Sequence, residues 1–454
     1  MLQLEASIQQ RTGPRSEARR GGGSVTALQA REGSGAMSAS TRDRAAWRRF
    51  RQFWASTAAS NLADGMLLAA TPLVALTLTR DPLAITTVTA VQYLPWLLFS
   101  VPLGTLADRV DRMVLLRMAS TTRALGVGLL ALALATGHVH LLMLYALSFL
   151  FGLAETLYDN TSSALIPTLV EDHQLERANG RLYATCTVAN SFAGPPLGGS
   201  LFALSVAAPF ALGAAGYAVA AVLLTVLPLR RSKRAPHRVP TTFVTDLKAG
   251  VRGFTGSPLL VSLCVLFGVG NLASSAVYGL ISLTVVERLD ASPATFGLVL
   301  AGGAVGAFLG GTYGDRIGGL TRPGTALLWT TVVSGLATAA VGLADHVVVL
   351  SALMAVDGFV VVTQSVIAVS LRARLIPDRM LGRVTAVFRT LSTGASALGA
   401  ILGGLLARAL GLSWPFLIAG ALVVALGPTL FRWLSNDRIE ASLRTQQATQ
   451  QTKK

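Results

Sequence analysis

The chain has 454 residues, of which 52% are hydrophobic and only 13% are charged, and its mean hydropathy is +0.57. This composition excludes a soluble protein and predicts a membrane protein with many apolar helices. The formal net charge of +16 lies mostly in two tails and one central loop, and no basic motif with interleaved aromatic residues occurs, so nucleic acid is not an expected partner.

Residues 1–51 form a basic tail that is rich in Gly, Arg, Ser and Gln and lacks apolar periodicity. We expect this tail to be disordered and cytoplasmic. The first apolar run is of full spanning length and has no cleavage pattern, so no signal peptide is predicted. Met37 opens an ordinary cytoplasmic lead-in, and residues 1–36 are expected to be an upstream extension without function.

Twelve apolar segments follow, each long enough to cross the roughly 30 Å hydrocarbon core of a bilayer as a helix. The sequence predicts an all-α membrane protein with twelve transmembrane helices in two six-helix bundles, residues 52–229 and 258–434. A cytoplasmic linker, 230–257, joins them, and a cytoplasmic tail, 435–454, ends the chain. The expected spans are 52–79, 84–106, 113–136, 139–166, 181–205, 209–229, 258–286, 293–312, 323–343, 347–371, 383–408 and 413–434.

The placement of basic residues predicts the orientation of the chain. With both termini in the cytoplasm, nearly every Arg and Lys faces inward, and only Arg80, Arg288 and Arg408 face outward. This location also puts basic residues near anionic lipid headgroups. Within the linker, residues 241–256 fit either a short amphipathic helix on the inner surface or a plain solvated loop.

One pattern occurs twice in the chain. Gly104-x-x-x-Asp108-Arg109-x-x-Arg112 follows the second span, and Gly311-x-x-x-Asp315-Arg316 follows the eighth, 207 residues later. The two bundles are therefore copies of one unit and are expected to be pseudo-symmetric. Such a pair has its natural cavity where the copies meet, near the bilayer midplane, which is the physical basis of alternating access.

The repeated charged loop can act as a gate. A carboxylate at a helix N-terminus is stabilised by about 0.3–1 kcal/mol, so Asp108 with Arg109 and Arg112 can favour one gate state. Asp315 and Arg316 offer the same device to the second half. The alternative is a tight turn with solvated charges, and repetition at matching positions favours the gate.

Span five contains a second structural motif. Gly194-Pro195-Pro196 removes two backbone donors in mid-helix, and Gly198-Gly199 removes side-chain bulk on the next turn. The pattern predicts a kinked helix with a close-packing face. This helix either pivots during transport or holds a static bend.

Five charged residues lie inside spans, where each costs about 2.5–3.5 kcal/mol on insertion scales and is a functional candidate by default. Glu155 and Asp159 share one face of span four, and two close carboxylates favour each other's protonation, which suits a proton-coupling site. Arg123 lies at a similar depth and can hold one of them ionised, so a structural ion pair is the alternative. The other two, Asp64 and Asp357, are candidates for proton or substrate handling, although Asp357 could instead cap a helix break at Gly358.

The rest of the cavity is expected to be apolar with scattered hydrogen-bonding groups. Each candidate for substrate contact could equally face lipid or another helix, and Arg389 belongs either at the inner gate or toward the cytoplasmic interface. The substrate-binding candidates are Asn61, Gln92, Tyr93, Trp96, Asn271, Tyr278, Thr363 and Gln364.

Taken together, these motifs resemble the major facilitator superfamily. The loop that begins at Gly104 resembles its signature loop, and Gly194-Pro195-x-x-Gly198-Gly199 resembles its antiporter motif. Ala164-Leu-Ile-Pro167 with Arg177-Ala-Asn179, and Gly382-Arg383-Val384 with Arg389, resemble the twelve-span drug and siderophore exporters related to macrolide efflux proteins and the enterobactin exporter. The resemblance covers roughly residues 50–435.

The resemblance implies export of a small amphipathic molecule, drug-like or siderophore-like, by alternating access and proton antiport. Two positions depart from it. Ser148 stands where the antiporter pattern has an Arg, so proton coupling through that Arg is not carried over, and Asn190 replaces an upstream Gly of span five, which weakens the case for close helix approach there. A facilitator or importer on the same fold, including a lysophospholipid flippase, is the alternative.

No nucleophile, metal cluster or nucleotide-binding loop occurs in the sequence, so neither an enzyme nor a metal or other cofactor is predicted. We expect a monomer in the plasma (inner) membrane, with a small-molecule substrate, protons and membrane lipids as its partners.

Overall fold

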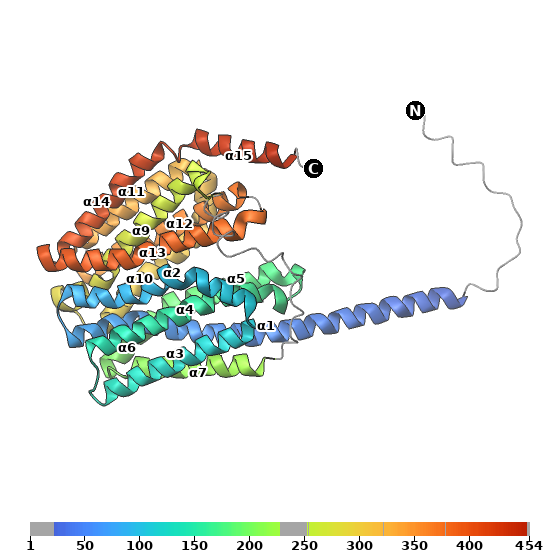
Figure 1. Ribbon diagram of the computed structural model, residues 1–454, viewed down its shortest axis with the longest axis horizontal. Helices are drawn as coiled ribbons and strands as arrows, with labels where there is room; N and C mark the ends of the chain where they lie inside the picture. Colours follow the sequence, from blue (N-terminus) through green and yellow to red (C-terminus); the bar gives the residue numbers. More distant parts are fainter. Residues whose placement is uncertain (1–21, 228–251, 253, 321, 377, 452–454) are drawn as a thin grey trace, which may run out of the picture.

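The computed structural model describes residues 22–227, 252, 254–320, 322–376 and 378–451, and within these ranges its regular elements are all helical (Figure 1). The first half of the chain contains α1 (Gly22–Leu78), α2 (Pro82–Arg109), α3 (Arg112–Ala135), α4 (Leu141–Leu169), α5 (Leu175–Cys186), the π-helix η2 (Thr187–Ala193), α6 (Gly194–Leu204) and α7 (Ala208–Val226). The second half contains α9 (Pro258–Leu283), the π-helix η3 (Thr284–Arg288), α10 (Pro293–Leu320), α11 (Pro323–Val341), α12 (Val347–Leu375), α13 (Asp378–Leu410), α14 (Ser413–Phe431) and α15 (Asn436–Gln451).

Eleven helices of the described chain are long and apolar enough to cross a membrane. The predicted fifth span is not among them because it consists of three consecutive pieces, α5, η2 and α6. These pieces follow one another without a non-helical residue over 175–204, so they can form one membrane crossing. The expectation of twelve crossing segments is therefore met approximately, and the all-helical fold is confirmed.

The two halves have the same internal packing. In the first half α2 packs on α4, α3 packs on α4 and α7, and α1 packs on α6 and α7. The second half repeats these pairs: α10 packs on α12, α11 on α12 and α14, and α9 on α13 and α14. In Figure 1 the first bundle lies below the second. This repetition is what the duplicated sequence predicts for two pseudo-symmetric bundles.

The chain enters and leaves the bundles at one end, which we call the terminal end. Figure 1 shows the outer part of α1 and the helix α15 on the same side of the molecule. The short connections after α1, α3, α6, η3, α11 and α13 lie at the opposite end, which we call the hairpin end. Two of these connections turn at glycines with positive φ, Gly137 at 72° and Gly411 at 97°, where a side chain would be strained.

Two seams join the halves, one between α2 and α13 and the other between α6 and α10. At the first, a Cβ on Gly404 would lie 2.8 Å from Cα of Leu83. At the second, a Cβ on Gly199 would lie 2.6 Å from the carbonyl oxygen of Pro293. Both contacts are backbone to backbone at the hairpin end, so glycine is what permits the two halves to meet there.

Ion pairs reinforce the contact at the hairpin end. Arg80 lies 3.4 Å from Glu287, and Arg408 lies 3.7 Å from Asp81, each pair joining one half to the other. Asp81 also accepts a hydrogen bond from the Leu83 amide and caps the start of α2. The pairs are largely exposed and contribute little stability individually, but they fix the side on which the halves touch.

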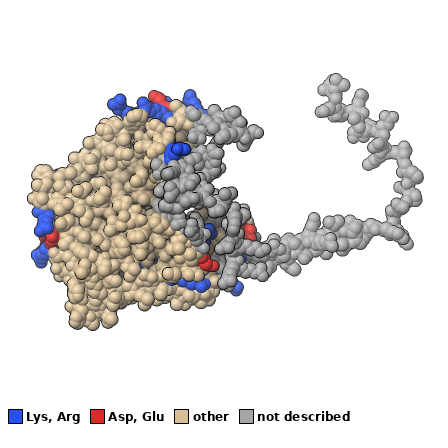
Figure 2. Space-filling view, in the orientation of Figure 1, with Lys and Arg blue, Asp and Glu red and all other residues tan. Residues whose placement is uncertain are grey.

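The surface of the bundles fits a lipid environment. Figure 2 shows that charged side chains on this face gather near the helix ends, with a broad uncharged surface between them. Large apolar side chains are exposed on the spanning helices, for example Leu204 at 82% and Leu142 at 77%. Surface of this kind is stable only when covered by lipid or by another protein.

The predicted tails need one revision. Residues 22–51 were expected to be disordered, whereas the structure makes them helical as the first part of α1. They extend a helix that is already nucleated by the span, so Ala, Gln and Arg residues can continue it at little cost. Residues 1–21, and most of the predicted linker with its candidate amphipathic segment 241–256, lie outside the described residues.

Candidate functional site

The centre of the first bundle is a buried arginine in an aromatic cage. Arg123 of α3 is 2% exposed, and its guanidinium lies over three rings: Phe151 at 5.3 Å, Tyr158 at 5.1 Å and Tyr217 at 5.6 Å from the ring centroids. Desolvated cation–π contacts of this kind are worth up to about 2 kcal/mol. Side chains of three helices, α3, α4 and α7, therefore meet at one buried cation.

The charge of Arg123 is balanced by Asp64 of α1. One guanidinium nitrogen lies 3.4 Å from the carboxylate and donates to the Ser60 hydroxyl at 3.2 Å, while Nε has no hydrogen-bond partner in the described part of the chain. The Tyr217 hydroxyl donates to the same Asp64 oxygen at 2.5 Å. The sequence predicted a cationic partner for Glu155 or Asp159, and the structure pairs Arg123 with Asp64 instead, because the facing side of α1 turns that carboxylate toward α3.

The α4 carboxylates have different surroundings. Asp159 forms an ion pair at 3.2 Å with Arg389 of α13, and both side chains are a little over 40% exposed. The Arg389 guanidinium also lies over the Trp96 ring of α2 at 4.4 Å. Arg389 therefore contacts two helices of the other half, and both members of the ion pair lie in the part of their spans nearer the terminal end. Glu155, one turn away, has Gln92 as a hydrogen-bonding neighbour and forms no ion pair with a described Lys or Arg, although the buried charge of Arg123 acts on it.

Span five combines a π-helix with close helix contact. The π-helix η2 directly precedes Gly194-Pro195-Pro196, and a widened turn is a common way to accommodate prolines that cannot donate. Close helix approach does occur at Asn190, although the sequence weakened the case for it. Gly65 of α1 packs against the Asn190 backbone, and a Cβ on Gly194 would lie 2.5 Å from Cα of Gly65. The glycine that permits this close approach is therefore Gly65 of the neighbouring helix α1.

The first repeated loop contains a helix cap that sequence reasoning missed. Asp111, rather than Asp108, accepts hydrogen bonds from the Met113 and Val114 amides at 2.8 and 3.3 Å and caps α3. The side chains of Asp108, Arg109 and Asp315 lie outside the described part. A Cβ on Gly104 would meet nothing within 4 Å, and Arg316 stacks on Tyr313 at 5.5 Å.

In the second half, Asp357 accepts a hydrogen bond from the Ser334 hydroxyl at 2.6 Å. The alternative in which Asp357 caps a break at Gly358 is wrong, because α12 runs unbroken through this position. Gly358 instead packs against the Gly303 backbone of α10. The carboxylate is therefore not needed for capping and is available for another role.

The candidate substrate residues differ in their surroundings. Thr363 is fully buried between α12 and α10, and Gln364 donates to Thr331 at 2.7 Å, so both face the interior of the second bundle. Asn271 donates to the Ser392 carbonyl of α13 at 2.9 Å, and Asn61 donates to a carbonyl of its own helix. Of the other four, Trp96 is buried beneath the Arg389 guanidinium, and Gln92, Tyr93 and Tyr278 are partly buried.

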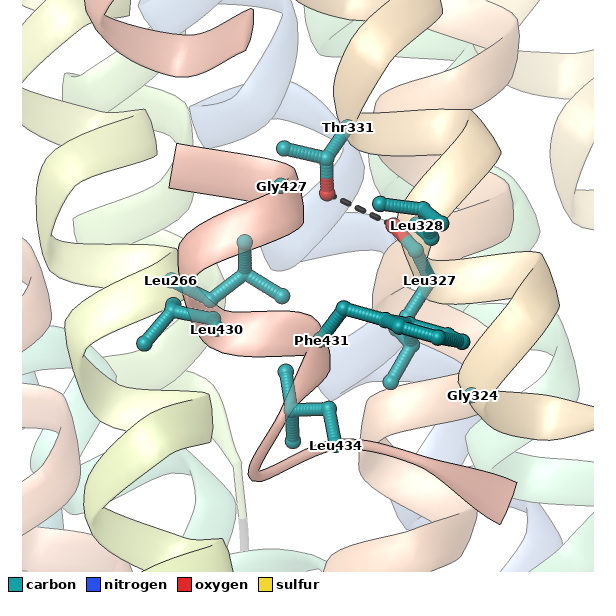
Figure 3. Close-up of a pocket in the computed structure, with 9 residues that line it drawn as sticks. All are labelled: Leu266, Gly324, Leu327, Leu328, Thr331, Gly427, Leu430, Phe431 and Leu434. Atoms are coloured by element: carbon teal, nitrogen blue, oxygen red, sulfur yellow. Dashed lines mark hydrogen bonds between the residues drawn. The ribbon is translucent and has the colours of Figure 1, made fainter. Parts of the chain in front are cut away.

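Two cavities lie in the second bundle. The one in Figure 3 is lined mainly by apolar side chains of α9, α11 and α14, and the hydroxyl of its Thr331 donates to the Leu327 carbonyl at 2.6 Å. The other, of about 40 Å³, is lined by Asp357 and Tyr278 among other residues. In the described part of the chain, His, Cys, Asp and Glu do not gather in threes that could hold a metal ion.

Comparison with known proteins gives consistent matches. Residues 44–450 match the profile of a family described as transmembrane secretion effector. The enterobactin exporter EntS of Shigella boydii serotype 18 is 28% identical over 304 residues, which cover 66% of this chain and 72% of that protein, and EntS of Escherichia coli O139:H28 matches equally. Among solved structures, the nucleoside transporter NupG has a TM-score of 0.72 at 13% identity over 85% of this chain and 100% of its own. A bacterial homologue of the iron transporter ferroportin in an inward-facing state has a TM-score of 0.68 at 16% identity over 86% and 99%. These two structural similarities support the fold of the chain alone.

Proposed function

Because this chain belongs to the transmembrane secretion effector family of the major facilitator superfamily and is a multi-pass transport protein of the inner membrane rather than an enzyme, we propose that it exports a small amphipathic molecule, drug-like or siderophore-like, in exchange for protons. The likeness to the enterobactin exporters supports export over import. The substrate would occupy the space between the two bundles and be exposed to each side of the membrane in turn.

The terminal end is proposed to face the cytoplasm. The basic tail and linker support this orientation through the positive-inside rule, and their Arg and Lys residues would contact anionic headgroups. The halves touch at the hairpin end, where Arg80 pairs with Glu287. This conformation would then be closed to the outside and open to the cytoplasm. The structurally similar ferroportin homologue is in an inward-facing state as well. The protein is proposed to act as a monomer.

The observation that carries proton coupling is the ion pair between Asp159 and Arg389. It joins the two halves in the part of the spans nearer the terminal end, and both side chains are more than 40% exposed, so the carboxylate can exchange protons with the space between the halves. A proton on Asp159 would remove its charge and release Arg389, so proton uptake would alter the contact between the halves. Glu155 on the same helix face and Asp64 beside Arg123 supply further titratable groups, as proposed from the sequence.

The two remaining motifs are proposed to serve the movement itself. The loops after α2 and α10 would close the terminal end in the opposite state, with Gly104 then in contact rather than in open space. Span five would act as the pivot, since its π-helix and Gly194 lie against Gly65 of the same half while Gly199 touches the other. The variant Asp108→Asn tests the gate role of the loop after α2. Transport is expected to fall while membrane insertion is retained, and unchanged transport would count against a gate.

The test is transport by the purified protein in proteoliposomes. Enterobactin and the fluorescent cation ethidium are supplied on the side of the terminal end, with and without an imposed pH difference. Accumulation against the concentration gradient only with the pH difference supports the proposal, whereas equilibration that ignores pH identifies a facilitator. Asp159→Asn is expected to abolish accumulation. The matched control Asp345→Asn removes an exposed hairpin-end carboxylate that pairs with Arg288 and is expected to retain it.

A further inference from the structure

A second cluster of arginines around an aromatic ring lies at the terminal end, between α1 and α5, which pack on each other (Figure 1). The guanidinium groups of Arg177 and Arg181 each lie 5.1 Å from the centroid of the Trp47 ring. Both arginines are exposed, and neither forms an ion pair within the described part of the chain. Arg177 opens the Arg177-Ala-Asn179 segment, which has no role in the proposed transport cycle.

This cluster holds two like charges close together. Two guanidinium groups that contact one ring cannot be further apart than twice their distance from its centroid. Residues four apart share one helix face, and like charges at this spacing repel each other. The Trp47 ring offsets part of the repulsion, because its π face attracts both cations. An anion that accepts hydrogen bonds from both arginines would offset the rest, so the cluster favours an anionic ligand.

A third arginine extends the cluster on α1. Arg51 is exposed and stands four residues after Trp47, on the same helix face. Glu176 of α5 is also exposed, but it forms no ion pair with a described Lys or Arg. Among the described residues the three arginines are therefore without a paired carboxylate. Guanidinium groups bind phosphate through two parallel hydrogen bonds, which makes phosphate the best-matched anion.

The cluster lies at the depth of the lipid headgroups. The apolar part of α1, Ala46–Leu78, has 33 residues, which correspond to about 50 Å of helix. A bilayer with its headgroup layers is about 40–45 Å thick, so Trp47 reaches the headgroup layer at the terminal end even when Leu78 lies at the opposite surface. Trp is enriched at this level, and basic pockets between spanning helices bind anionic headgroups there. A lipid phosphate is therefore within reach of the arginines.

We propose that Trp47, Arg51, Arg177 and Arg181 form a binding site for the phosphate of an anionic phospholipid. The lipid comes from the leaflet at the terminal end, which is the cytoplasmic leaflet in the proposed orientation. The site takes a membrane lipid and not the exported substrate, so it does not depend on the export function. Because α5 continues into η2 without a break, a lipid bound here also holds α5 to α1 at the start of span five.

The test is native mass spectrometry of the purified full-length protein in detergent, with equal amounts of phosphatidylglycerol and phosphatidylcholine added. Both lipids carry a phosphate, but only phosphatidylglycerol has a net negative charge. The wild type is expected to retain phosphatidylglycerol at least tenfold better than phosphatidylcholine. Arg177→Gln combined with Arg181→Gln is expected to lose at least tenfold in phosphatidylglycerol binding, because each arginine near an anionic headgroup contributes about a factor of five.

Arg432→Gln combined with Arg438→Gln is the matched control. It removes the same charge from the terminal end of the second half, where Arg438 lies over the exposed Trp433 ring at 4.6 Å. Among the described residues no second guanidinium shares that ring, so phosphatidylglycerol binding is expected to stay within twofold of the wild type. An equal loss in the control would mean that general surface charge binds the lipid, and would overturn the proposal.

Arg51→Gln provides a second variant, which leaves both arginine contacts with Trp47 in place and is expected to lose about fivefold. Equal retention of the two lipids by the wild type, or unchanged phosphatidylglycerol binding in both arginine variants, would overturn the proposal. Displacement of phosphatidylglycerol by sodium phosphate at equal concentration would do so as well, because it would identify a site for the free ion. Neither substrate nor a pH gradient is present, so the result is independent of the transport assay.

Discussion

The buried pair of Asp64 and Arg123 should respond differently to the loss of each member. The exposed fraction is 1% for the Arg123 side chain and 15% for that of Asp64. Asp64→Asn leaves a guanidinium that cannot lose its proton, and an uncompensated buried charge costs about 3–5 kcal/mol. The three rings and Ser60 still contact the cation, so we expect a loss near the lower limit, about 3 kcal/mol.

Arg123→Met leaves a carboxylate, which can become neutral by binding a proton. An exposed aspartate has a pKa of about 3.9, so protonating it costs about 4 kcal/mol at pH 7 and about 1.5 kcal/mol at pH 5. These values are upper limits for the cost of the unpaired carboxylate, to which the lost contacts of Arg123 with the three rings add. Because its folded state holds a proton that the unfolded chain lacks at pH 7, its stability should improve as the pH falls. The loss in Asp64→Asn should not change between pH 7 and pH 5.

The assay is thermal unfolding of detergent-purified protein, followed by tryptophan fluorescence, with each variant compared with the wild type at both pH values. The double variant Asp64→Asn with Arg123→Met should be close to the wild type, since replacing a whole buried pair by uncharged groups is often neutral. Losses in Arg123→Met that do not shrink at pH 5, or a double variant as unstable as Asp64→Asn, would refute the reasoning.

Three further predictions concern other contacts. Charge reversal at Asp159 together with Arg389 should retain more transport in proteoliposomes than either single reversal, with little change in melting temperature because a half-exposed pair is worth at most about 1 kcal/mol. Gly199→Ala should open the hairpin end, because the new Cβ would press on a backbone oxygen of α10 at a cost of about 1–3 kcal/mol. Spin-label distances measured across the hairpin end should therefore increase. In the control Gly104→Ala the new Cβ meets open space, and the distances should not change. Asn436→Ala should lower the melting temperature through the loss of about 0.5–2 kcal/mol, since its side chain caps the first turn of α11; an unchanged value would show that the cap is dispensable.

The architecture was largely predictable because hydropathy and the repeated motif depend on residues close together in the sequence. Spans longer than the hydrocarbon core, and one pattern in both halves, were enough to predict two bundles of six. The tail was mispredicted over residues 22–51, because composition alone does not show that a neighbouring helix can extend into a polar segment. The π-helix in span five was signalled only indirectly, by Pro195 and Pro196.

The partners of the charged groups were less predictable. The rotation of one helix relative to another is not encoded locally, so Arg123 could be placed at the right depth but not assigned to Asp64, which is 59 residues away. Tyr217 and Ser334 donate hydrogen bonds to Asp64 and Asp357. The sequence could identify them as donors only by listing the hydroxyl groups at the same predicted depth as a carboxylate. Thr363 shows the reverse case, since a polar residue in a span can be fully buried against a backbone carbonyl.

Both seams between the bundles are built from helices that belong wholly to one half or the other. A gene divided within the region encoding residues 230–257 would therefore still specify both faces of each seam. The two co-expressed fragments should associate in the bilayer and form a heterodimer, in which each duplicated unit is a separate subunit.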